Sequence, residues 1–412
     1  MKNSVLVLCA LLCFALLSLI ACDSFFDSQN PETTPSPNEI EDDLRTEKQD
    51  NLNRLHDQPD STITESPYIV TTIAAGYDFT LAIKADSSLW GWGNNISGEL
   101  GLGTWEAPTV PRRIMGNVAH VAAGYGHSMA ITTDGVLWGW GWNISGQVGD
   151  GTAYTRFYPV RVMENVVFVA TGQYTTFAIT DCGALWGWGF NNNGEVGVEG
   201  YEELHFPTFV MDNIVYVSAG GNHGLAITAE GELWGWGWNG AGQLGDGTFY
   251  DRFSPVYIMS NVAQVSTGFD YTLVITTTGE LWGFGNNNFG ELGGGAVDYH
   301  SVPFFLRDGV AYVSAGFAHT MIITEGGELL ATGQNESGQL GVPQRWPRRQ
   351  FVHVMYDIVA VSVGQGHTVA ITIDGALLAW GDNHAGQIGD GSLENRNTPT
   401  VIIQPGEAYH TI

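Results

Sequence analysis

Four histidines stand at one position of a repeated pattern, and imidazole is the side chain best suited to bind metals or move protons near neutral pH. They are His127, His223, His319 and His367. Phe79, Thr175 and Tyr271 occupy the same position in the other repeats. A position that accepts Phe and Tyr, and that recurs once in every repeat, is typical of a buried structural residue. We therefore expect packed histidines here, and no metal site.

Aspartates in Gly-Asp-Gly turns are a second group with ligand chemistry. Asp150, Asp246 and Asp390 each lie between two glycines, and their carboxylates could ligate calcium. Turn aspartates also stabilise their own backbone, which is the simpler interpretation. No nucleophile, carboxylate pair or metal cluster departs from the repeat pattern. Because catalysis needs one asymmetric constellation, we expect no enzymatic activity, no catalytic residues and no cofactor.

The elements that carry these residues recur as 48-residue units. One glycine column comprises Gly76, Gly124, Gly172, Gly220, Gly268, Gly316 and Gly364. An asparagine column comprises Asn95, Asn143, Asn191, Asn239, Asn287, Asn335 and Asn383. Seven such units fill residues 68–403. A constant period over that length indicates a repeat architecture in which each unit packs on its neighbours.

One unit, residues 116–163, shows the expected elements. Apolar alternation predicts strands over 117–124, 127–132, 136–141 and 159–163, with an Asp134-Gly135 hairpin turn between the second and third. Pro159 restricts the fourth strand to an outer edge. Four antiparallel strands in each of seven units predict an all-β, seven-bladed β-propeller, with the Trp rings of the third strand filling the wedge between blades. The ring could close by packing of the last blade on the first, or by a terminal strand that joins the first blade.

This unit is similar to a known repeat. His127, Asp134-Gly135, Leu137-Trp138-Gly139-Trp140-Gly141, Asn143 and Gly146–Thr152 resemble the regulator of chromosome condensation repeat. The resemblance covers all seven units, and the sixth departs most, with Leu330 and Thr332 in place of two Trp and Phe351 in place of Pro. It implies a seven-bladed propeller. It also implies the activity that gives the family its name, guanine-nucleotide exchange on a small nuclear GTPase with attachment to chromatin.

Residues 1–21 have the features of a bacterial lipoprotein signal peptide. An apolar run at 5–20, short for a membrane span, ends in Leu19-Ile20-Ala21-Cys22, which resembles the lipobox. We expect Cys22 to carry two acyl chains, enough for stable anchoring. Residues 22–66 hold twelve acidic and three basic side chains and several prolines, so we expect a disordered tether. The propeller would then span 67–412 and lie outside the cytoplasm, lipid-anchored to the cell membrane.

Aromatic residues cluster in the segment that varies most between units, just before the fourth strand. The candidates for partner binding are Trp105, Tyr154, Tyr158, Tyr201, His205, Phe249, Tyr250, Tyr299 and Trp346. Variable loops of repeat proteins gather on one face and carry recognition, and aromatic side chains dominate binding hot spots. The alternative is that these side chains cap the blade edges, as Arg156, Arg252, Arg348 and Arg396 in the same loops suggest for part of the set.

Charge and location decide between the expected functions. A net charge of −28 argues against nucleic acid as a partner, because phosphate binding needs clustered Lys and Arg. We expect a monomeric, membrane-anchored binding module for an unidentified protein or cell-surface ligand. Guanine-nucleotide exchange is an alternative that a secreted lipoprotein disfavours, because it would meet neither the GTPase nor chromatin. A carbohydrate-binding lectin is a second alternative, which rests on the aromatics alone.

Overall fold

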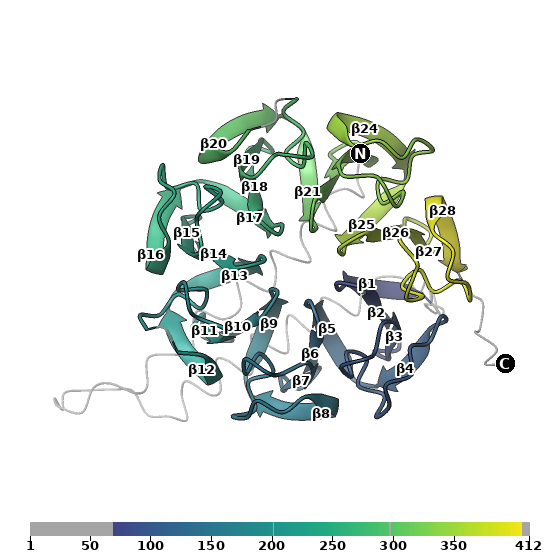
Figure 1. Cartoon of the computed structure of the whole chain (residues 1–412), viewed down its shortest axis with the longest axis horizontal. Helices are drawn as coiled ribbons and strands as arrows, with labels where there is room; N and C mark the ends of the chain where they lie inside the picture. The colour runs from purple at the N-terminus through teal and green to yellow at the C-terminus, as the bar shows by residue number, and fades with distance from the viewer. Residues whose placement is uncertain (1–68, 201, 296–297, 406–412) are drawn as a thin grey trace, which may run out of the picture. The chain divides into compact units, whose positions relative to one another are not determined.

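The computed structural model describes residues 69–200, 202–295 and 298–405, so the expected signal peptide, Cys22 and the tether lie outside the described residues. Within those ranges the chain forms 28 β-strands in seven four-stranded antiparallel sheets arranged as a ring (Figure 1). The described part contains no helix, and thus none with the length and apolar character that crossing a bilayer requires. The predicted all-β propeller of seven four-stranded blades is confirmed.

Each blade takes its four strands consecutively from the chain, and Figure 1 shows the first strand of every blade nearest the centre. The innermost strands are β1 (Val70–Ala75), β5 (Val118–Ala123), β9 (Val166–Thr171), β13 (Ile214–Ala219), β17 (Val262–Thr267), β21 (Val310–Ala315) and β25 (Ile358–Val363). The second strands are β2 (Phe79–Lys84), β6 (His127–Thr132), β10 (Thr175–Thr180), β14 (His223–Thr228), β18 (Tyr271–Thr276), β22 (His319–Thr324) and β26 (His367–Thr372). The third strands are β3 (Leu89–Gly93), β7 (Leu137–Gly141), β11 (Leu185–Gly189), β15 (Leu233–Gly237), β19 (Leu281–Gly285), β23 (Glu328–Gly333) and β27 (Leu377–Gly381). The outer strands are β4 (Arg112–Met115), β8 (Arg156–Met163), β12 (Leu204–Met211), β16 (Arg252–Met259), β20 (His300–Arg307), β24 (Arg348–Tyr356) and β28 (Arg396–Ile403).

The strands agree closely with those expected from the sequence. The second strand of the unit analysed above coincides with the expected 127–132, and the third begins one residue later than expected, at Leu137. The fourth begins at Arg156 instead of Pro159, because Arg156 still pairs with Gly141 of the third strand. Pro159 therefore lies within an outer strand that pairs on one side, where its missing N–H is tolerated.

The connections from one blade to the next are tight turns, and they require a left-handed backbone. Asn117, Asn165, Asn213, Asn261, Gly309 and Asp357 stand one repeat period apart and all have φ between 58° and 71°. Asn, Asp and Gly are the residues that adopt this conformation at least cost. The sequence thus supplies the same tight connection six times, which keeps the blades at one spacing.

Hydrophobic cores lie between blades. Seven clusters of buried residues each join side chains of two neighbouring blades, and the second Trp of the third-strand motif is fully buried in most of them. Trp140 of blade 2, for example, packs with Leu81 and Leu89 of blade 1. The predicted use of Trp rings as wedges between blades is confirmed.

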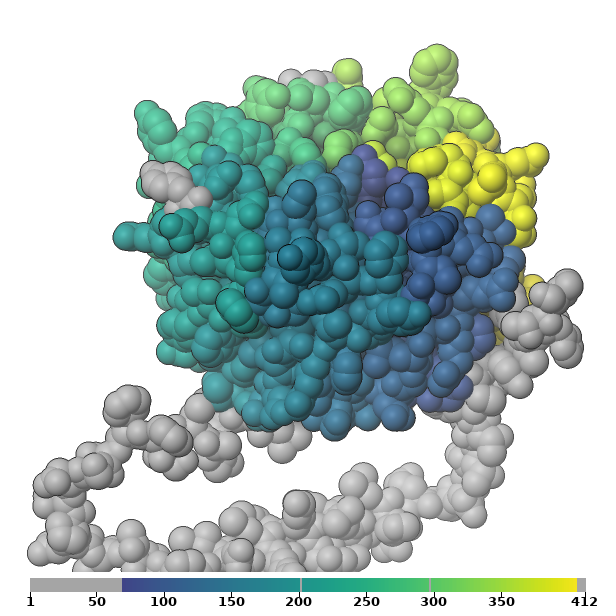
Figure 2. All heavy atoms as spheres, turned by 60° about the horizontal axis from the view of Figure 1, so that its bottom comes forward, coloured from purple at the N-terminus to yellow at the C-terminus, as the bar shows by residue number. Residues whose placement is uncertain are grey.

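The ring closes by contacts between complete blades. Among the described residues, blade 1 contains only β1–β4 and blade 7 only β25–β28, so no strand is exchanged between the two blades. Val70, Ala82 and Trp92 of blade 1 share a buried cluster with Val369, Ala379 and Ile403 of blade 7. The Trp92 indole donates to the Gln387 carbonyl at 3.0 Å, as Trp140 does to Glu99 at 2.7 Å in the next junction. Figure 2 shows blades 7 (yellow) and 1 (dark blue) in direct contact at the surface.

Candidate partner-binding face

Two sets of loops lie on one face of the ring, which we call the rim face. In each blade the start of the second strand pairs with the end of the third; His127, for example, is opposite Gly141. The turns between first and second strands therefore lie on the same face as the long loops between third and fourth strands. The turns between first and second strands lie near the centre, because the first strands are innermost. The long loops between third and fourth strands lie toward the outside (Figure 1). Every described aromatic candidate named from the sequence lies in the long loops or at the start of an outer strand.

The histidine column is structural. His127 is fully buried, and its Nε2 lies 2.9 Å from Thr176 Oγ1 of the next blade. The Thr176 hydroxyl donates to the Gln147 carbonyl at 2.8 Å, so the imidazole N–H must be the donor to Oγ1. The same arrangement recurs at His223, His319 and His367, with distances of 3.0–3.1 Å to the threonine of the following blade. Burial lowers the pKa of His127, His223 and His319 to about 3, and that of His367 to about 4.

The Gly-Asp-Gly aspartates are also structural. Asp150 accepts hydrogen bonds from the Thr152 backbone and hydroxyl at 3.1 and 2.8 Å and forms an ion pair with Arg156. Burial raises the pKa of Asp150, but the hydrogen bonds from Thr152 and Arg156 outweigh it, so the pKa is lowered overall. Asp246 and Asp390 have equivalent partners in Arg252 and Arg396. Their carboxylate oxygens are occupied by the loop itself, which agrees with the turn interpretation over calcium binding.

Asparagines of the repeated column hold the long loops in one shape. Asn143 is buried; its Oδ1 accepts from the Val148 N–H at 2.8 Å, and its Nδ2 donates to the Thr152 and Tyr154 carbonyls at 2.9 and 3.2 Å. Asn95 and Asn383 make the corresponding bonds in blades 1 and 7. The loops therefore present equivalent positions at equivalent places around the ring.

One of these equivalent positions is aromatic on alternate blades. Tyr154, Tyr250 and Trp346 stand two repeat periods apart, on blades 2, 4 and 6, and are 74–76% exposed. Blades 1, 3, 5 and 7 carry exposed acidic residues at the same position: Glu106, Glu202, Asp298 and Glu394. We call these seven residues the outer rim. Trp105, beside Glu106, is 78% exposed and adds a fourth large aromatic side chain.

The remaining candidates divide between solvent and packing. Phe249 and Tyr299 are about half exposed, and the Tyr299 hydroxyl accepts from Asn288 Nδ2 at 3.0 Å. Tyr158 lies over the turn glycine of the preceding blade, Gly103, where a Cβ would collide with its ring, so it caps a blade edge. His205 packs in the same manner on Gly146, with its Nε2 3.6 Å from a Glu203 carboxylate oxygen. Tyr201 lies outside the described residues.

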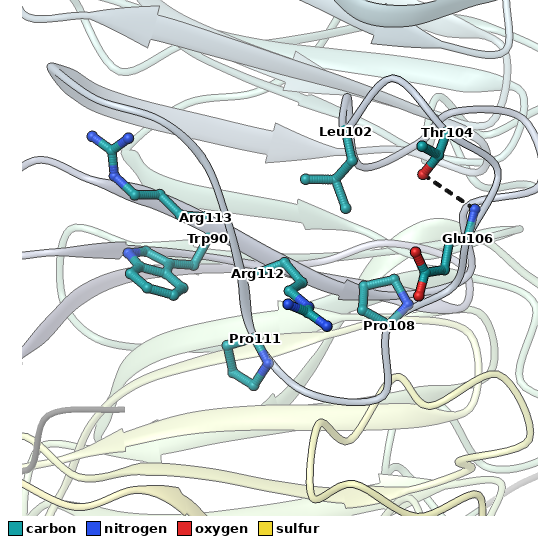
Figure 3. A pocket seen from close by; sticks show the side chains of 8 residues that line it. All are labelled: Trp90, Leu102, Thr104, Glu106, Pro108, Pro111, Arg112 and Arg113. Atoms are coloured by element: carbon teal, nitrogen blue, oxygen red, sulfur yellow. Dashed lines mark hydrogen bonds between the residues drawn. The ribbon is translucent and has the colours of Figure 1, made fainter. Parts of the chain in front are cut away.

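Blade 1 has a groove at its outer edge (Figure 3). Leu102 and Pro108 stand where blade 2 has Asp150 and Arg156, so the ion pair that closes the loop is missing, and β4 is only four residues long. The result is a cleft of about 540 Å³ lined by Trp90, Leu102, Thr104, Glu106, Pro108, Pro111, Arg112 and Arg113. Its lining combines the apolar side chains of Trp90, Leu102 and the two prolines with the charged side chains of Glu106, Arg112 and Arg113.

A second cluster of aromatic side chains surrounds the centre of the rim face and was not predicted from the sequence. Tyr77 and Tyr125 have ring centroids 3.9 Å apart, and Tyr125, Trp142, Tyr174 and Phe190 continue the contacts at 5.4–6.2 Å. All five are half-buried. Tyr77, Tyr125 and Tyr174 lie in turns between first and second strands, and Trp142 and Phe190 directly follow third strands, so the signal was present at two positions that vary from unit to unit.

Acidic groups accompany these aromatics. Asp78 and Asp270 occupy the same position in blades 1 and 5, and burial raises the pKa of each to about 6; for Asp78, His384 opposes and Asp382 adds to the rise. Burial likewise raises the pKa of Glu291 to about 7. Blades 1 and 5 thus carry buried or half-buried carboxyl groups on the side of the rim face.

Away from this face, Cys182 is exposed in the turn between β10 and β11, with its sulfur 3.2 Å from Thr180 Oγ1. The turn was expected from the sequence. It lies on the opposite face, because it joins a second to a third strand.

Comparisons with known proteins agree with this architecture. A family model described as an RCC1-like domain matches residues 38–252, more than half of the chain. Models of the regulator of chromosome condensation (RCC1) repeat match residues 230–275, 278–323, 326–371 and 374–410, and a related repeat model matches 262–291, 310–339 and 358–387. No curated protein matches the sequence.

Solved structures share the fold at low identity. Human WBSCR16 has a TM-score of 0.71 and 24% identity, covering 77% of this chain and 94% of its own. Prp20p from Saccharomyces cerevisiae, described with its binding to Gsp1p and histones, has a TM-score of 0.71 and 20% identity, covering 84% and 90%. Yeast RCC1 (Prp20), in a complex with Kap60, has a TM-score of 0.70 and 19% identity, covering 92% and 91%.

Proposed function

Because the chain belongs to the regulator of chromosome condensation repeat family, we propose that it is a binding scaffold, anchored by lipid outside the cytoplasm, whose rim face docks a protein partner. The outer rim carries the proposal. Tyr154, Tyr250 and Trp346 are about three-quarters exposed although each is held in a loop braced by a buried asparagine. Large aromatic side chains on rigid supports lose little entropy on binding and are what hot spots are built from.

The charge of the outer rim indicates the kind of partner. Four exposed carboxylates alternate with the three aromatics around the outer rim. Such a pattern favours a partner that offers basic side chains between apolar patches, because complementary charge speeds encounter and excludes acidic competitors. The yeast Prp20p structures, described with Gsp1p, histones or Kap60, are examples of this fold in proteins that bind other proteins.

The proposed location rests on the lipobox-like sequence at Cys22 and on the acidic stretch that follows it. A diacylated N-terminus would hold the protein at a membrane surface. Labelled palmitate should enter the wild-type chain and not a Cys22→Ala variant, which should leave the membrane fraction. Equal labelling of the two would refute the anchor and leave the rim untouched.

A binding role without catalysis fits the chemistry of the described residues. The buried histidines serve as neutral hydrogen-bond donors between blades, and the loop aspartates are tied to arginines. Guanine-nucleotide exchange and carbohydrate binding have no specific observation in their favour. The acidic rim is unfavourable for nucleic acid.

Crosslinking in intact cells tests the proposal. The full chain, with an affinity tag, is compared with a Tyr154→Ala/Tyr250→Ala/Trp346→Ala variant and with a control, Tyr356→Ala/Ile373→Ala, which removes exposed apolar side chains from the opposite face. We expect one partner to be retained by the wild type and the control and lost by the rim variant, with retention falling as salt is raised. Equal retention by all three folded proteins would place binding elsewhere.

A further inference from the structure

Ring closure brings together three side chains from the two ends of the propeller. Asp78 belongs to the turn between β1 and β2, and Asp382 and His384 follow β27 of blade 7. One ligand atom from each lies within 4.8 Å of the other two, and within the described ranges this is the one such group of three. No motif in the sequence indicates it, because the residues meet only when blade 7 packs on blade 1.

The geometry of the imidazole is that of a metal ligand. His384 Nδ1 lies 2.7 Å from Asp382 Oδ2, and an ionised carboxylate can only accept, so Nδ1 carries the proton. A metal would bind the neutral ring, in which Nε2 carries the lone pair, and Nε2 faces Asp78 Oδ2 at 3.7 Å. A carboxylate that fixes the ring through its other nitrogen is the usual second partner of a metal-bound histidine.

The spacing between the two facing atoms favours an ion between them. A separation of 3.7 Å is too long for a hydrogen bond. Two ligands at about 2.0–2.1 Å from a tetrahedral zinc ion are about 3.4 Å apart, so a small movement of the exposed His384 side chain would seat the ion.

Asp78 supplies the independent sign of a missing ligand. The residue is only 8% exposed, and its Oδ1 has no hydrogen-bond partner among the described residues. A buried carboxylate oxygen without a partner is costly, and a second carboxylate beside it adds repulsion. A divalent cation held by both oxygens of the Asp78 carboxylate would offset the missing hydrogen bond and the repulsion between the two carboxylates.

The most similar junction elsewhere in the ring lacks this set. Asp270 of blade 5 is equivalent to Asp78, and blade 4 stands before it as blade 7 stands before blade 1. Blade 4 has Trp238 and Gly240 at the positions of Asp382 and His384. Asp270 also has a buried Oδ1 without a partner among the described residues, but no imidazole in the matching position. The site thus departs from the seven-fold pattern.

We propose that His384 and Asp78, with Asp382 orienting the imidazole, bind one divalent transition-metal ion such as Zn²⁺ at the junction of blades 7 and 1. The mixed nitrogen and oxygen donors select such an ion over Ca²⁺ or Mg²⁺, which prefer oxygen alone. His384 is exposed at the rim face, so water or a group from a partner completes the coordination. The proposal is independent of whether a protein docks on the outer rim.

Isothermal titration of the metal-free full chain with Zn²⁺ alone tests the site. We expect one strong binding event, lost in His384→Ala and in Asp78→Asn, and weakened about 10–100-fold in Asp382→Asn. Two variants are matched controls. Asp270→Asn changes a carboxyl at the equivalent position of blade 5, and His353→Ala removes an exposed histidine that pairs with Glu328. Both should bind Zn²⁺ as the wild type does.

A second measurement distinguishes loss of Zn²⁺ binding from misfolding of a variant. Zn²⁺ should raise the melting temperature of the wild type and of both controls, and Ca²⁺ should not, while the His384→Ala variant should melt normally without responding to Zn²⁺. Undiminished Zn²⁺ binding by folded His384→Ala, or no strong binding by the wild type, would overturn the proposal and leave the cluster as a His–carboxylate ion pair.

Discussion

The buried histidines make the stability of the propeller depend on acid in a way that one substitution can isolate. His127 is neutral in the folded chain, where burial lowers its pKa to about 3, against 6.5 as its ordinary value. When the folded pKa of a histidine is depressed, the unfolded chain takes up the proton first. The stabilising contribution of neutral burial is therefore complete above about pH 6.5 and is lost progressively as the pH falls toward 3.

The size of the effect follows from these values. Between pH 7 and pH 5 the unfolded imidazole becomes largely protonated while the buried one stays neutral, which costs about 2 kcal/mol for one histidine. In His127→Gln the amide N–H can still donate to Thr176 Oγ1, but nothing titrates. The variant starts less stable because the ring is lost, yet the same linkage should shrink the gap between wild type and variant by about 2 kcal/mol at pH 5.

Equilibrium urea denaturation at the two pH values measures this gap. Tyr271 holds the same position in blade 5 and donates to the His319 carbonyl at 2.7 Å, so Tyr271→Phe removes an inter-blade bond without a group that titrates in this range. Its gap to wild type should be the same at both pH values. If His127→Gln and Tyr271→Phe behave alike, the neutral buried histidine is not the source of acid sensitivity.

Three further predictions concern packing between blades. A Cβ at Gly124 would stand 2.7 Å from His127 Cε1 and 2.8 Å from the Gly172 carbonyl oxygen, so Gly124→Ala should lower the free energy of unfolding by about 2 kcal/mol or more. Gly326→Ala should be nearly neutral, because the new Cβ would be 3.7 Å from its nearest neighbour, Thr324 Oγ1. Trp140→Phe removes the indole hydrogen bond to the Glu99 carbonyl and should lower the free energy of unfolding by about 1 kcal/mol. An equal loss in Trp92→Phe would show that this hydrogen bond contributes as much at the closing junction as at an internal one. The exposed Cys182 thiol should react fully with a maleimide without a change in melting temperature, because its turn lies outside every inter-blade core, and a fall of several degrees would contradict that placement.

The repeat period made the fold predictable, because every blade has the same pattern of strand and turn residues. The alternating strand residues, the Asp-Gly turn and the Trp-Gly-Trp-Gly strand each define a local element, and seven equal copies leave a closed ring as the way to bury every wedge. The role of the histidine column was also predictable, since Phe and Tyr replace it. The closure between blades 7 and 1 was not, because packing without strand exchange and a shared blade give the same sequence pattern.

The candidate site was predictable only in part. The aromatic loops were recognised by composition, but both Tyr154 and Tyr158 are exposed, and only Tyr158 lies over a turn glycine of the neighbouring blade, a contact that composition does not reveal. The groove of blade 1 arises from what is missing, an Asp–Arg pair replaced by Leu102 and Pro108. The cluster of Asp78 and His384 depends on a contact across the whole chain, which no local pattern encodes.

Closure without strand exchange also makes the seven junctions interchangeable as places for chain ends. A circular permutant that joins the present ends of the propeller with a short linker and opens the chain at Asn213, between blades 3 and 4, would cut no sheet and expose no unpaired strand edge. The same property lets such a ring grow or diversify by duplication of whole blades, since each copy carries its own complete sheet and its half of two interfaces. Surface features on single blades, such as the groove of blade 1, can then change without disturbing the other six.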